Sequence, residues 1–366
     1  MYKDKPQHAS DRGGLSIGVP GELRGLELAH ARHGQLEWSQ VVEPAYRLAA
    51  DGVPINANLA HEIGILATRY SMPSNSDFDF GLRKLLTHDD DWRHPLQTGD
   101  VIHNPALANT LKAVRDSGAD ALYKGPLAEA LAKDIQDAGG IVTKEDIELY
   151  KATIRTPVVA HDIYGFSVVG VPPPSSGGAA IVGAARFLSD FTTPFAAFPE
   201  TLSVHRMVEA SKHVFAIRMS LSDPDYNSEI VSDAVRDLIS GPYMKDLAEA
   251  TRDDRSHGLS WYGGYKWAQL KDTDGQMNVT DADEGDRRVR RLQRKLARRF
   301  GNLNDGGTSH LSIVDKDGNA VSMTTSISKY DCRDSSTGAC VCVFSQVDVI
   351  LTVIALEQTT ISEATF

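Results

Sequence analysis

Residues 308–326 read TSHLSIVDKDGNAVSMTTS, two alternating runs separated by a short polar turn. Leu311 and Ile313 fall on one face of the first run, and Val321 and Met323 fall on one face of the second. Since successive strand residues point to opposite faces, these apolar pairs meet only in a register that keeps parity. In that register Leu311 faces Met323 and Ile313 faces Val321. The stretch therefore predicts an antiparallel hairpin with one apolar face.

The turn residues favour this register. A three-residue loop, residues 316–318, keeps parity and puts Gly318 in the left-handed position that ends such loops. A two-residue loop of Asp317 and Gly318 would shift the register by one residue and separate the apolar pairs. The favoured register also sets Thr308 opposite Ser326, with both hydroxyls on the other, polar face.

A glycine-rich segment, residues 304–307, precedes the first strand. In N-terminal nucleophile hydrolases, a hydroxyl residue at the start of a strand attacks the peptide bond that precedes it. In this chain the hydroxyl of Thr308 would make that attack. The freed α-amino group then serves as the base for the same hydroxyl. Gly307 permits the strained backbone that this step needs. The same residues can also simply open a hairpin, and the local features alone favour that plainer interpretation. His310 shares the face of Thr308, where a structural hydrogen bond is favoured over a general-base role.

The composition indicates an ordinary globular protein with an acidic balance. The 366 residues are 41% hydrophobic and 24% charged, enough for one large domain or two modest ones. The net charge of -11 argues against nucleic acid or an anionic membrane as a partner, because phosphate binding needs a basic surface. The basic stretch 287–299 opposes that balance. A solvated helix or linker is the favoured interpretation, and a patch for an anionic partner is the alternative.

The sequence indicates no metal, cofactor or leader peptide. An odd number of cysteines in one short tract, Cys332, Cys340 and Cys342, is no disulfide framework. A zinc site would need a second cysteine pair or a histidine cluster, which this tract lacks. Residues 1–12 are polar, are expected to be disordered and show no apolar signal-peptide region. The most apolar run, residues 341–356, is too short and too polar to span a bilayer.

Local signals predict helices through much of the chain before the hairpin. The predicted helices cover residues 21–34, 39–51, 105–116, 127–138, 144–150 and 203–221. Asn104 is the expected N-cap of the third helix, and residues 143–146 form a capping box for the fifth. The last helix is amphipathic, with Val204, Met207, Val208, Ser211 and Phe215 on one largely apolar stripe.

Two further segments carry turn or linker signals. Residues 166–171 predict a strand that enters Pro-Pro-Pro-Ser-Ser-Gly-Gly at 172–178. Ser175 and Ser176 are interpreted as turn residues, because the sequence places no base beside either. Residues 251–300 are polar and rich in glycine and charge, which favours a linker or an exposed excursion.

Several segments, taken in order, resemble one known family. They are Gly-Leu-Ser-Ile-Gly-Val-Pro-Gly (14–21), Glu-Pro-Ala (43–45) with Leu-Ala-Ala-Asp-Gly (48–52), Tyr-Lys-Gly (123–125), Gly-Gly-Ile-Val-Thr-Lys-Glu-Asp (139–146), Pro-Pro-Pro-Ser-Ser-Gly-Gly (172–178), Glu-Ala-Ser-Lys (209–212) with Ser-Asp-Pro-Asp (222–225), and the hairpin sequence 308–321. Each segment is a weak signal alone. Their order and spacing over residues 13–328 resemble the γ-glutamyltranspeptidase (glutathione hydrolase) family.

The resemblance implies an α+β fold, the αββα sandwich of N-terminal nucleophile hydrolases, here incomplete. Members of the family are made as one precursor that cuts itself into two subunits. The resemblance divides this chain into an N-terminus (1–12), a partial large-subunit region (13–307), the start of the small-subunit region with the nucleophile hairpin (308–328) and a non-family tail (329–366).

The resemblance also implies an activity and a site. Cleavage between Gly307 and Thr308 would free Thr308 to attack the γ-glutamyl amide of glutathione and its conjugates, giving a γ-glutamyl ester. Water would resolve this ester in hydrolysis, and an amino acid or dipeptide would resolve it in transpeptidation. Ser326 stands where the family has a threonine that hydrogen-bonds the nucleophile. Ser328 stands where an asparagine helps to hold the glutamate α-amino group.

The match begins at Gly13 and stops after Ser328, so we expect a member that is truncated at both ends. The family's arginine for the α-carboxylate, its acidic pair for the α-amino group, and the serine pair and diglycine of its oxyanion site have no counterpart. Two alternatives stay open: a catalytically inactive fragment from a truncated or mispredicted gene, and a related N-terminal nucleophile acylase. By resemblance, the protein would enter the secretory route to the plasma membrane, the exterior or the vacuole.

Overall fold

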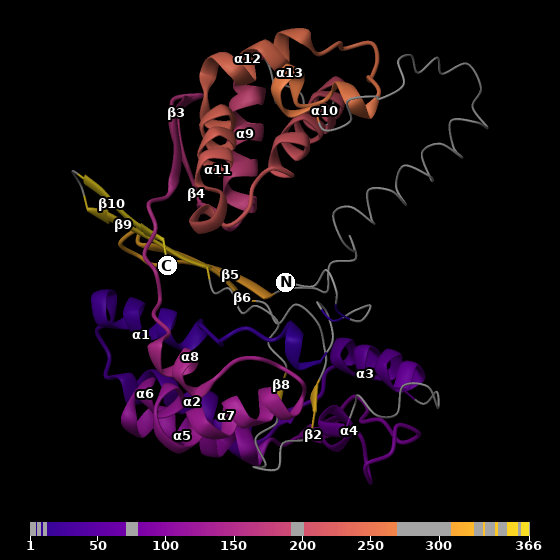
Figure 1. The fold of residues 1–366 in the computed structure, drawn as a ribbon, viewed down its shortest axis with the longest axis vertical. Coiled ribbons are helices and arrows are strands. Elements are labelled where there is room, and N and C mark those ends of the chain that lie inside the picture. Colours follow the sequence, from indigo (N-terminus) through magenta and orange to yellow (C-terminus); the bar gives the residue numbers. More distant parts are fainter. Residues whose placement is uncertain are drawn as a thin grey trace.

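The computed structural model describes residues 13–70, 80–191, 201–268 and 309–325, the strands 332–333, 341–342, 350–357 and 360–365, and the isolated residues 5 and 9. Figure 1 shows two groups of helices with a sheet between them. We call residues 13–150 the lower lobe and residues 158–268 the upper lobe. Helices and strands are both abundant, so the predicted α+β class is confirmed.

The lower lobe consists of helices and one pair of very short strands. Its elements are η1 (Gly14–Ser16), α1 (Glu22–His33), α2 (Trp38–Asp51), β1 (Val53–Pro54), α3 (Ala57–Tyr70), α4 (Phe80–Leu86), β2 (Val101–Ile102), α5 (Pro105–Ser117), α6 (Asp120–Tyr123), α7 (Gly125–Asp137) and α8 (Lys144–Leu149). Two apolar clusters hold them together, one around Tyr123, Ile135 and Ile147 and the other around Ile55 and Ile63.

The helix boundaries here follow local capping chemistry. The Asn104 side chain accepts a hydrogen bond from the backbone N–H of Leu107 at 3.0 Å, so α5 begins as the sequence predicts. Thr143 and Asp146 each accept from the other's backbone N–H, and this capping box starts α8. Gly52 ends α2 with a φ of +93°, a conformation that suits glycine.

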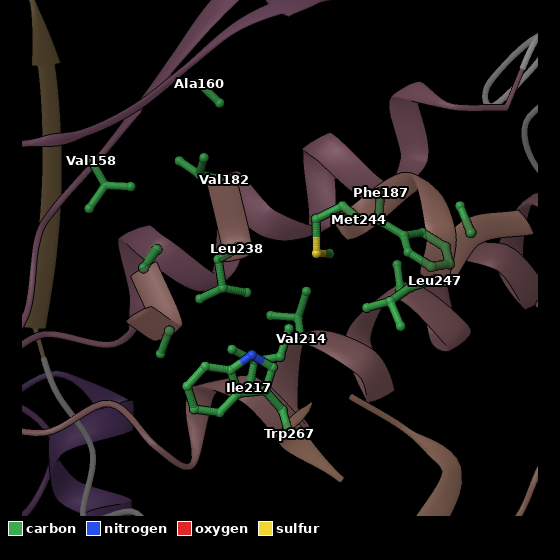
Figure 2. Close-up of a cluster of buried hydrophobic side chains, with 14 of the residues drawn as sticks. Val158, Ala160, Val182, Phe187, Val214, Ile217, Leu238, Met244, Leu247 and Trp267 are labelled. Carbon is green, nitrogen blue, oxygen red and sulfur yellow. The ribbon is translucent and has the colours of Figure 1, made fainter. Parts of the chain in front are cut away.

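The upper lobe packs four main helices against a two-stranded sheet. Its elements are β3 (Val158–Ile163), β4 (Phe166–Gly170), α9 (Gly177–Ser189), α10 (Thr201–Arg218), α11 (Pro224–Ile239), α12 (Gly241–Ala250), η3 (Leu259–Trp261) and α13 (Gly264–Trp267). Figure 2 shows its core, in which Val182, Leu238 and Met244 lie between the strands and the side chains of α10.

Helix α9 begins inside the glycine pair of residues 177–178, where the sequence signals indicated only a turn. A Cβ on Gly178 would lie 2.1 Å from the backbone nitrogen of Val171, well inside van der Waals contact. Glycine therefore lets α9 approach the end of β4 closely. Ser175 and Ser176 lie in the connection just before the helix, in agreement with their interpretation as turn residues.

The apolar stripe predicted on α10 faces outward, contrary to the usual orientation of an amphipathic helix. Its four apolar residues are 39% to 56% exposed: Val204, Met207, Val208 and Phe215. The buried face instead carries two polar residues, Glu209 and His213, beside Ala210, Val214 and Ile217. The buried polar groups have partners in distant segments, which a helical pattern alone does not reveal.

The sheet between the lobes has the strand order β10-β9-β6-β5. It is formed by β5 (Ser309–Val314), β6 (Ala320–Thr325), β9 (Ile350–Glu357) and β10 (Thr360–Thr365), each antiparallel to its neighbour. A separate pair joins β7 (Cys332–Arg333) to β8 (Val341–Cys342). The Thr325 hydroxyl donates to Glu22 Oε2 at 3.1 Å and so connects β6 to the start of α1.

Candidate active site

The β5–β6 hairpin has the register that the sequence predicts. Leu311 pairs with Met323 and Ile313 pairs with Val321. The loop of residues 316–318 connects the strands, and the Asp315 N–H donates to the Asn319 carbonyl at 2.9 Å to close it. Parity is therefore kept, and all odd-numbered residues of the hairpin share one face.

The turn is stabilised by glycine geometry and by one aspartate. Gly318 has a φ of +88°, the left-handed conformation expected at this position. The Asp315 side chain accepts from the backbone N–H of Asp317 at 2.9 Å and from that of Asn319 at 2.8 Å. Hydrogen bonds from the Asn319 side chain and from the turn backbone lower the pKa of Asp315. These local contacts fix the register without help from either lobe.

The even-numbered face of the hairpin carries a connected polar group centred on His310. Its Nδ1 lies 2.7 Å from the Thr324 hydroxyl, directly across the strand pair. Its Nε2 lies 3.0 Å from the Ser312 hydroxyl and 3.2 Å from the Ser322 hydroxyl. We call these four residues the His310 group. The hydrogen-bonding role expected for His310 is confirmed, and strand parity was the signal that could have identified its three partners.

The predicted nucleophile and its neighbours fall outside the described part of the chain. Thr308 and Gly307 precede β5, and Ser326 and Ser328 follow β6. Their assignment as cleavage site, nucleophile and supporting residues stays a prediction. The described pairing ends with Ser309 opposite Thr325, one step short of the predicted pair of hydroxyls.

A second polar group, which the sequence reasoning did not identify, lies buried in the upper lobe. Glu209 is fully buried, and its Oε1 accepts from Lys212 Nζ and from the Ser256 hydroxyl, each at 2.7 Å. Its Oε2 accepts from the Tyr262 hydroxyl at 2.7 Å. The sequence signals were the i,i+3 spacing of Glu209 and Lys212 and their place in the Glu-Ala-Ser-Lys segment. Since a buried charge without partners is costly, this group fastens residues 256–262 to α10.

The charge states in this second group follow from burial and hydrogen bonding. Burial raises the pKa of Glu209, but the hydrogen bonds from Lys212, Ser256 and Tyr262 outweigh it, so its pKa lies below the usual value. Burial lowers the pKa of the neighbouring His213 to about 4. The His213 Nδ1 accepts from the Gly263 N–H at 3.2 Å, which agrees with a neutral ring.

Residues 251–268 are also attached to the rest of the upper lobe at their C-terminal end. Asp237 Oδ2 accepts from Lys266 Nζ and from the Trp267 indole, each at 2.8 Å. The Tyr243 hydroxyl donates to the Gly263 carbonyl at 2.7 Å. Trp267 is buried in the cluster of Figure 2. This first portion of the polar stretch 251–300 is therefore packed against α10, α11 and α12.

A groove of about 750 Å³ separates residues 153–159 from α11. Its lining is largely apolar, and each of its arginines is paired: Arg155 with Asp225 at 3.3 Å and Arg236 with Asp233 at 2.7 Å. Paired guanidinium groups make a poor binding site for an anionic substrate. The groove therefore does not compete with the hairpin as the candidate active site.

In the part of the chain that the structure describes, no group of three or more His, Cys, Asp or Glu side chains is placed to hold a metal ion. No helix in the same residues is long and apolar enough to cross a membrane.

The family model described as Gamma-glutamyltranspeptidase matches residues 1–331. Glutathione hydrolase 2 of Arabidopsis thaliana is 37% identical over 330 residues, which are 90% of this chain and 49% of that protein. The glutathione hydrolase proenzyme of Escherichia coli (strain K12) is 31% identical over 317 residues, 85% of this chain and 46% of that protein. The chain thus spans about half the length of the curated relatives it matches.

The fold has a counterpart among solved structures. The crystal structure of the Helicobacter pylori gamma-glutamyltranspeptidase is similar, with a TM-score of 0.63 and 26% sequence identity. The similarity covers 75% of this chain and 76% of that one. It confirms the fold that the sequence resemblance implied.

Proposed function

Since the chain belongs to the γ-glutamyltranspeptidase family, we propose that it is a γ-glutamyltransferase and glutathione hydrolase. The family match extends through the whole β5–β6 hairpin and the residues on either side of it. Thr308 is the proposed nucleophile, and the bond between Gly307 and Thr308 is the proposed self-cleavage site.

The observation that carries this proposal is the register of the hairpin. The described pairs, from Ser309 opposite Thr325 to Val314 opposite Ala320, follow one unbroken antiparallel register. Extended by one pair, that register would set Thr308 opposite Ser326, on the face that carries His310. In that arrangement the second hydroxyl would hydrogen-bond the nucleophile and orient it for self-cleavage and acyl transfer.

The proposed reaction has two stages. In maturation the Thr308 hydroxyl attacks the Gly307 carbonyl carbon, and the C–N bond breaks as the nitrogen takes a proton. Water then hydrolyses the resulting ester, which leaves a free α-amino group on Thr308 and a carboxylate on Gly307. This amine takes the hydroxyl proton when Thr308 attacks a γ-glutamyl amide, and the protonated amine returns it to the leaving group.

The acceptor decides the outcome of the second stage. Attack by water on the γ-glutamyl ester gives glutamate, whereas attack by the amine of an amino acid or dipeptide gives a new γ-glutamyl amide. Both paths pass through one covalent intermediate, so the kinetics should be ping-pong. Ser326 is proposed to hydrogen-bond the nucleophile, and Ser328 is proposed to help hold the substrate α-amino group. The secretory route is proposed as the location.

Self-cleavage provides the direct test. The full chain, freshly synthesised and incubated at neutral pH, should split into two fragments on a denaturing gel. N-terminal sequencing of the smaller fragment should begin at Thr308. Thr308→Ala should abolish the split, and Thr308→Ser should retain it, because serine keeps the hydroxyl.

Substrate specificity is tested next, on the processed protein. Glutathione should release glutamate, and added dipeptide should divert the γ-glutamyl group into a new amide, measured by mass spectrometry. A chain that stays intact would support the alternative of an inactive fragment. A chain that splits but hydrolyses only other amides would support the acylase alternative.

A further inference from the structure

Strand β5 forms one edge of the sheet, since the order β10-β9-β6-β5 gives it a single neighbour among the described strands. All six of its residues are exposed, whereas those of β6 are half-buried. β5 therefore stands clear of both lobes, and another chain can reach its free edge. Exposed strand edges pair readily with other chains unless something blocks them.

The usual means of blocking an edge are absent from β5. The strand Ser309–Val314 contains no lysine, arginine, aspartate, glutamate or proline, and its described pairing with β6 has no bulge. The strand at the opposite edge of the sheet, β10, carries Glu363. β5 is therefore the uncharged edge of this sheet.

The backbone groups on the free edge belong to alternate residues. The Asp315 N–H donates to the Asn319 carbonyl, so residue 315 turns its backbone towards the partner strand. Because this direction alternates along an antiparallel pair, the odd-numbered residues of β5 bond to β6. His310, Ser312 and Val314 turn their N–H and C=O groups outward. In the part of the chain that the structure describes, these outward groups have no hydrogen-bond partner.

A second copy of β5 matches this edge in antiparallel orientation about a twofold axis. When Ser312 lies opposite Ser312 of the second copy, His310 of each copy lies opposite Val314 of the other. Every outward residue then exchanges both backbone hydrogen bonds with an outward residue. A shift by one residue would set outward groups against groups already bonded to β6, and a shift by two would leave part of the edge unpaired.

The same register brings exposed apolar side chains together. Leu311 is 40% exposed and Ile313 is 58% exposed, and each would lie opposite the other across the junction. Six residues of strand extend about 20 Å, and with about 10 Å of side-chain height the junction measures roughly 200 Å² per copy. Stable complexes bury about 800 Å² per partner, so the strand junction alone supports a weak association.

We propose that the outer edge of β5 is an interface at which two copies of this chain pair, joining their four-stranded sheets into one. The copies associate reversibly, at a rising fraction as concentration rises. The net charge of -11 makes them repel one another, and salt screens this repulsion. This inference does not depend on the proposed function, because neither Thr308 nor self-cleavage enters it.

Sedimentation velocity of the full chain, from about 2 to 200 μM, tests the association. The wild type should shift from monomer to dimer over this range. Ser312→Pro removes the central outward N–H and leaves the bonds to β6, so it should raise the dissociation constant about tenfold or more. Ser312→Ala is the matched control: it removes the same hydroxyl but keeps the N–H, and it should associate as the wild type does.

Disulfide formation tests the register without relying on the proline variant. In the proposed pairing the Cα atoms of residue 312 in the two copies lie about 5.5 Å apart, within reach of a disulfide. Those of residue 309 lie about 20 Å apart. On a non-reducing gel, mild oxidation should therefore link two chains of Ser312→Cys. Ser309→Cys should give no more linked product than the wild type, which controls for the native cysteines.

Each outcome supports or overturns the proposal. A wild-type chain that stays monomeric throughout the concentration range would overturn it, as would a Ser312→Pro variant that associates like Ser312→Ala. Equal linking of Ser309→Cys and Ser312→Cys would refute the register. Association should strengthen with added salt. Association that weakens with salt would instead indicate contact between the basic stretch 287–299 and an acidic surface, and would also refute pairing through β5.

Discussion

Replacement of Tyr262 by phenylalanine should destabilise the upper lobe without creating a cavity. The Tyr262 side chain is 2% exposed, and its hydroxyl donates to Glu209 Oε2 at 2.7 Å. The Tyr262 hydroxyl oxygen also accepts hydrogen bonds from the His257 N–H and from Lys212 Nζ, both at 3.1 Å. Phenylalanine keeps the ring packing and removes all three contacts.

The magnitude follows from the charge and burial of the partner. A hydrogen bond to a charged group contributes about 1.5–3 kcal/mol, and a buried N–H that loses its acceptor adds to the loss. Tyr262→Phe should therefore lower the free energy of unfolding by about 2–4 kcal/mol. For a unit of this size, that corresponds to a fall in melting temperature of about 5–15 °C.

Tyr265→Phe is the matched control, because Tyr265 lies in the same segment and is 86% exposed. Urea unfolding followed by tryptophan fluorescence should separate the two variants, with Trp261 and Trp267 as reporters in the upper lobe. Hydrogen exchange of residues 251–268 should be faster in Tyr262→Phe. Equal unfolding midpoints for the two variants would refute the claim that the Glu209 contacts fasten this segment.

Three more predictions concern single residues. Burial lowers the pKa of His213 to about 4, so the unfolded chain binds a proton before the folded chain does as the pH falls below about 6.5. The free energy of unfolding, measured from urea midpoints at each pH, should therefore drop by about 3 kcal/mol towards pH 4. The drop should be smaller in His213→Gln and unchanged in His205→Gln. Gly178→Ala should lower the free energy of unfolding by about 2–3 kcal/mol, because its Cβ would lie 2.1 Å from a backbone atom. At Gly177 a Cβ meets open space, so Gly177→Ala should leave the melting temperature in calorimetry unchanged. Gly318→Ala should cost about 1–2 kcal/mol because its φ is +88°, and an unchanged melting temperature would contradict this.

Features that depend on neighbouring residues could be predicted from the sequence. The capping box at Thr143 and Asp146 starts α8 as expected, because both partners lie within one helical turn. The register of the β5–β6 hairpin was also predictable, since parity and the position of Gly318 determine it together. In each case the deciding interactions span only a few residues.

Features that depend on distant residues could not be predicted in this way. The sequence indicates which residues of α10 are apolar but not which side of the helix receives partners from residues 251–267. From the sequence Glu209 is expected at the surface, because its partners Ser256 and Tyr262 lie far along the chain. The start of α9 at Gly177 was missed because paired glycines usually mark a turn, and only the close approach to Val171 explains them.

The candidate site lies between these two cases. The His310 group follows from strand parity once the hairpin is accepted, whereas the roles of Thr308, Ser326 and Ser328 rest on family resemblance. The hydrogen bond from Thr325 to Glu22 joins residues that are 303 positions apart in the sequence, and no local pattern indicates it.

The short loop of the β5–β6 hairpin has a consequence for the order of assembly. Closing three residues costs little chain entropy, and an isolated hairpin forms in about 1–10 μs. The pairing of β6 with β9 must instead close a much longer loop, and it comes later for the same reason. The strand that follows the proposed cleavage point can thus acquire its register early in folding. Since a lone hairpin is only marginally stable, pairing with β9 stabilises the register that forms early.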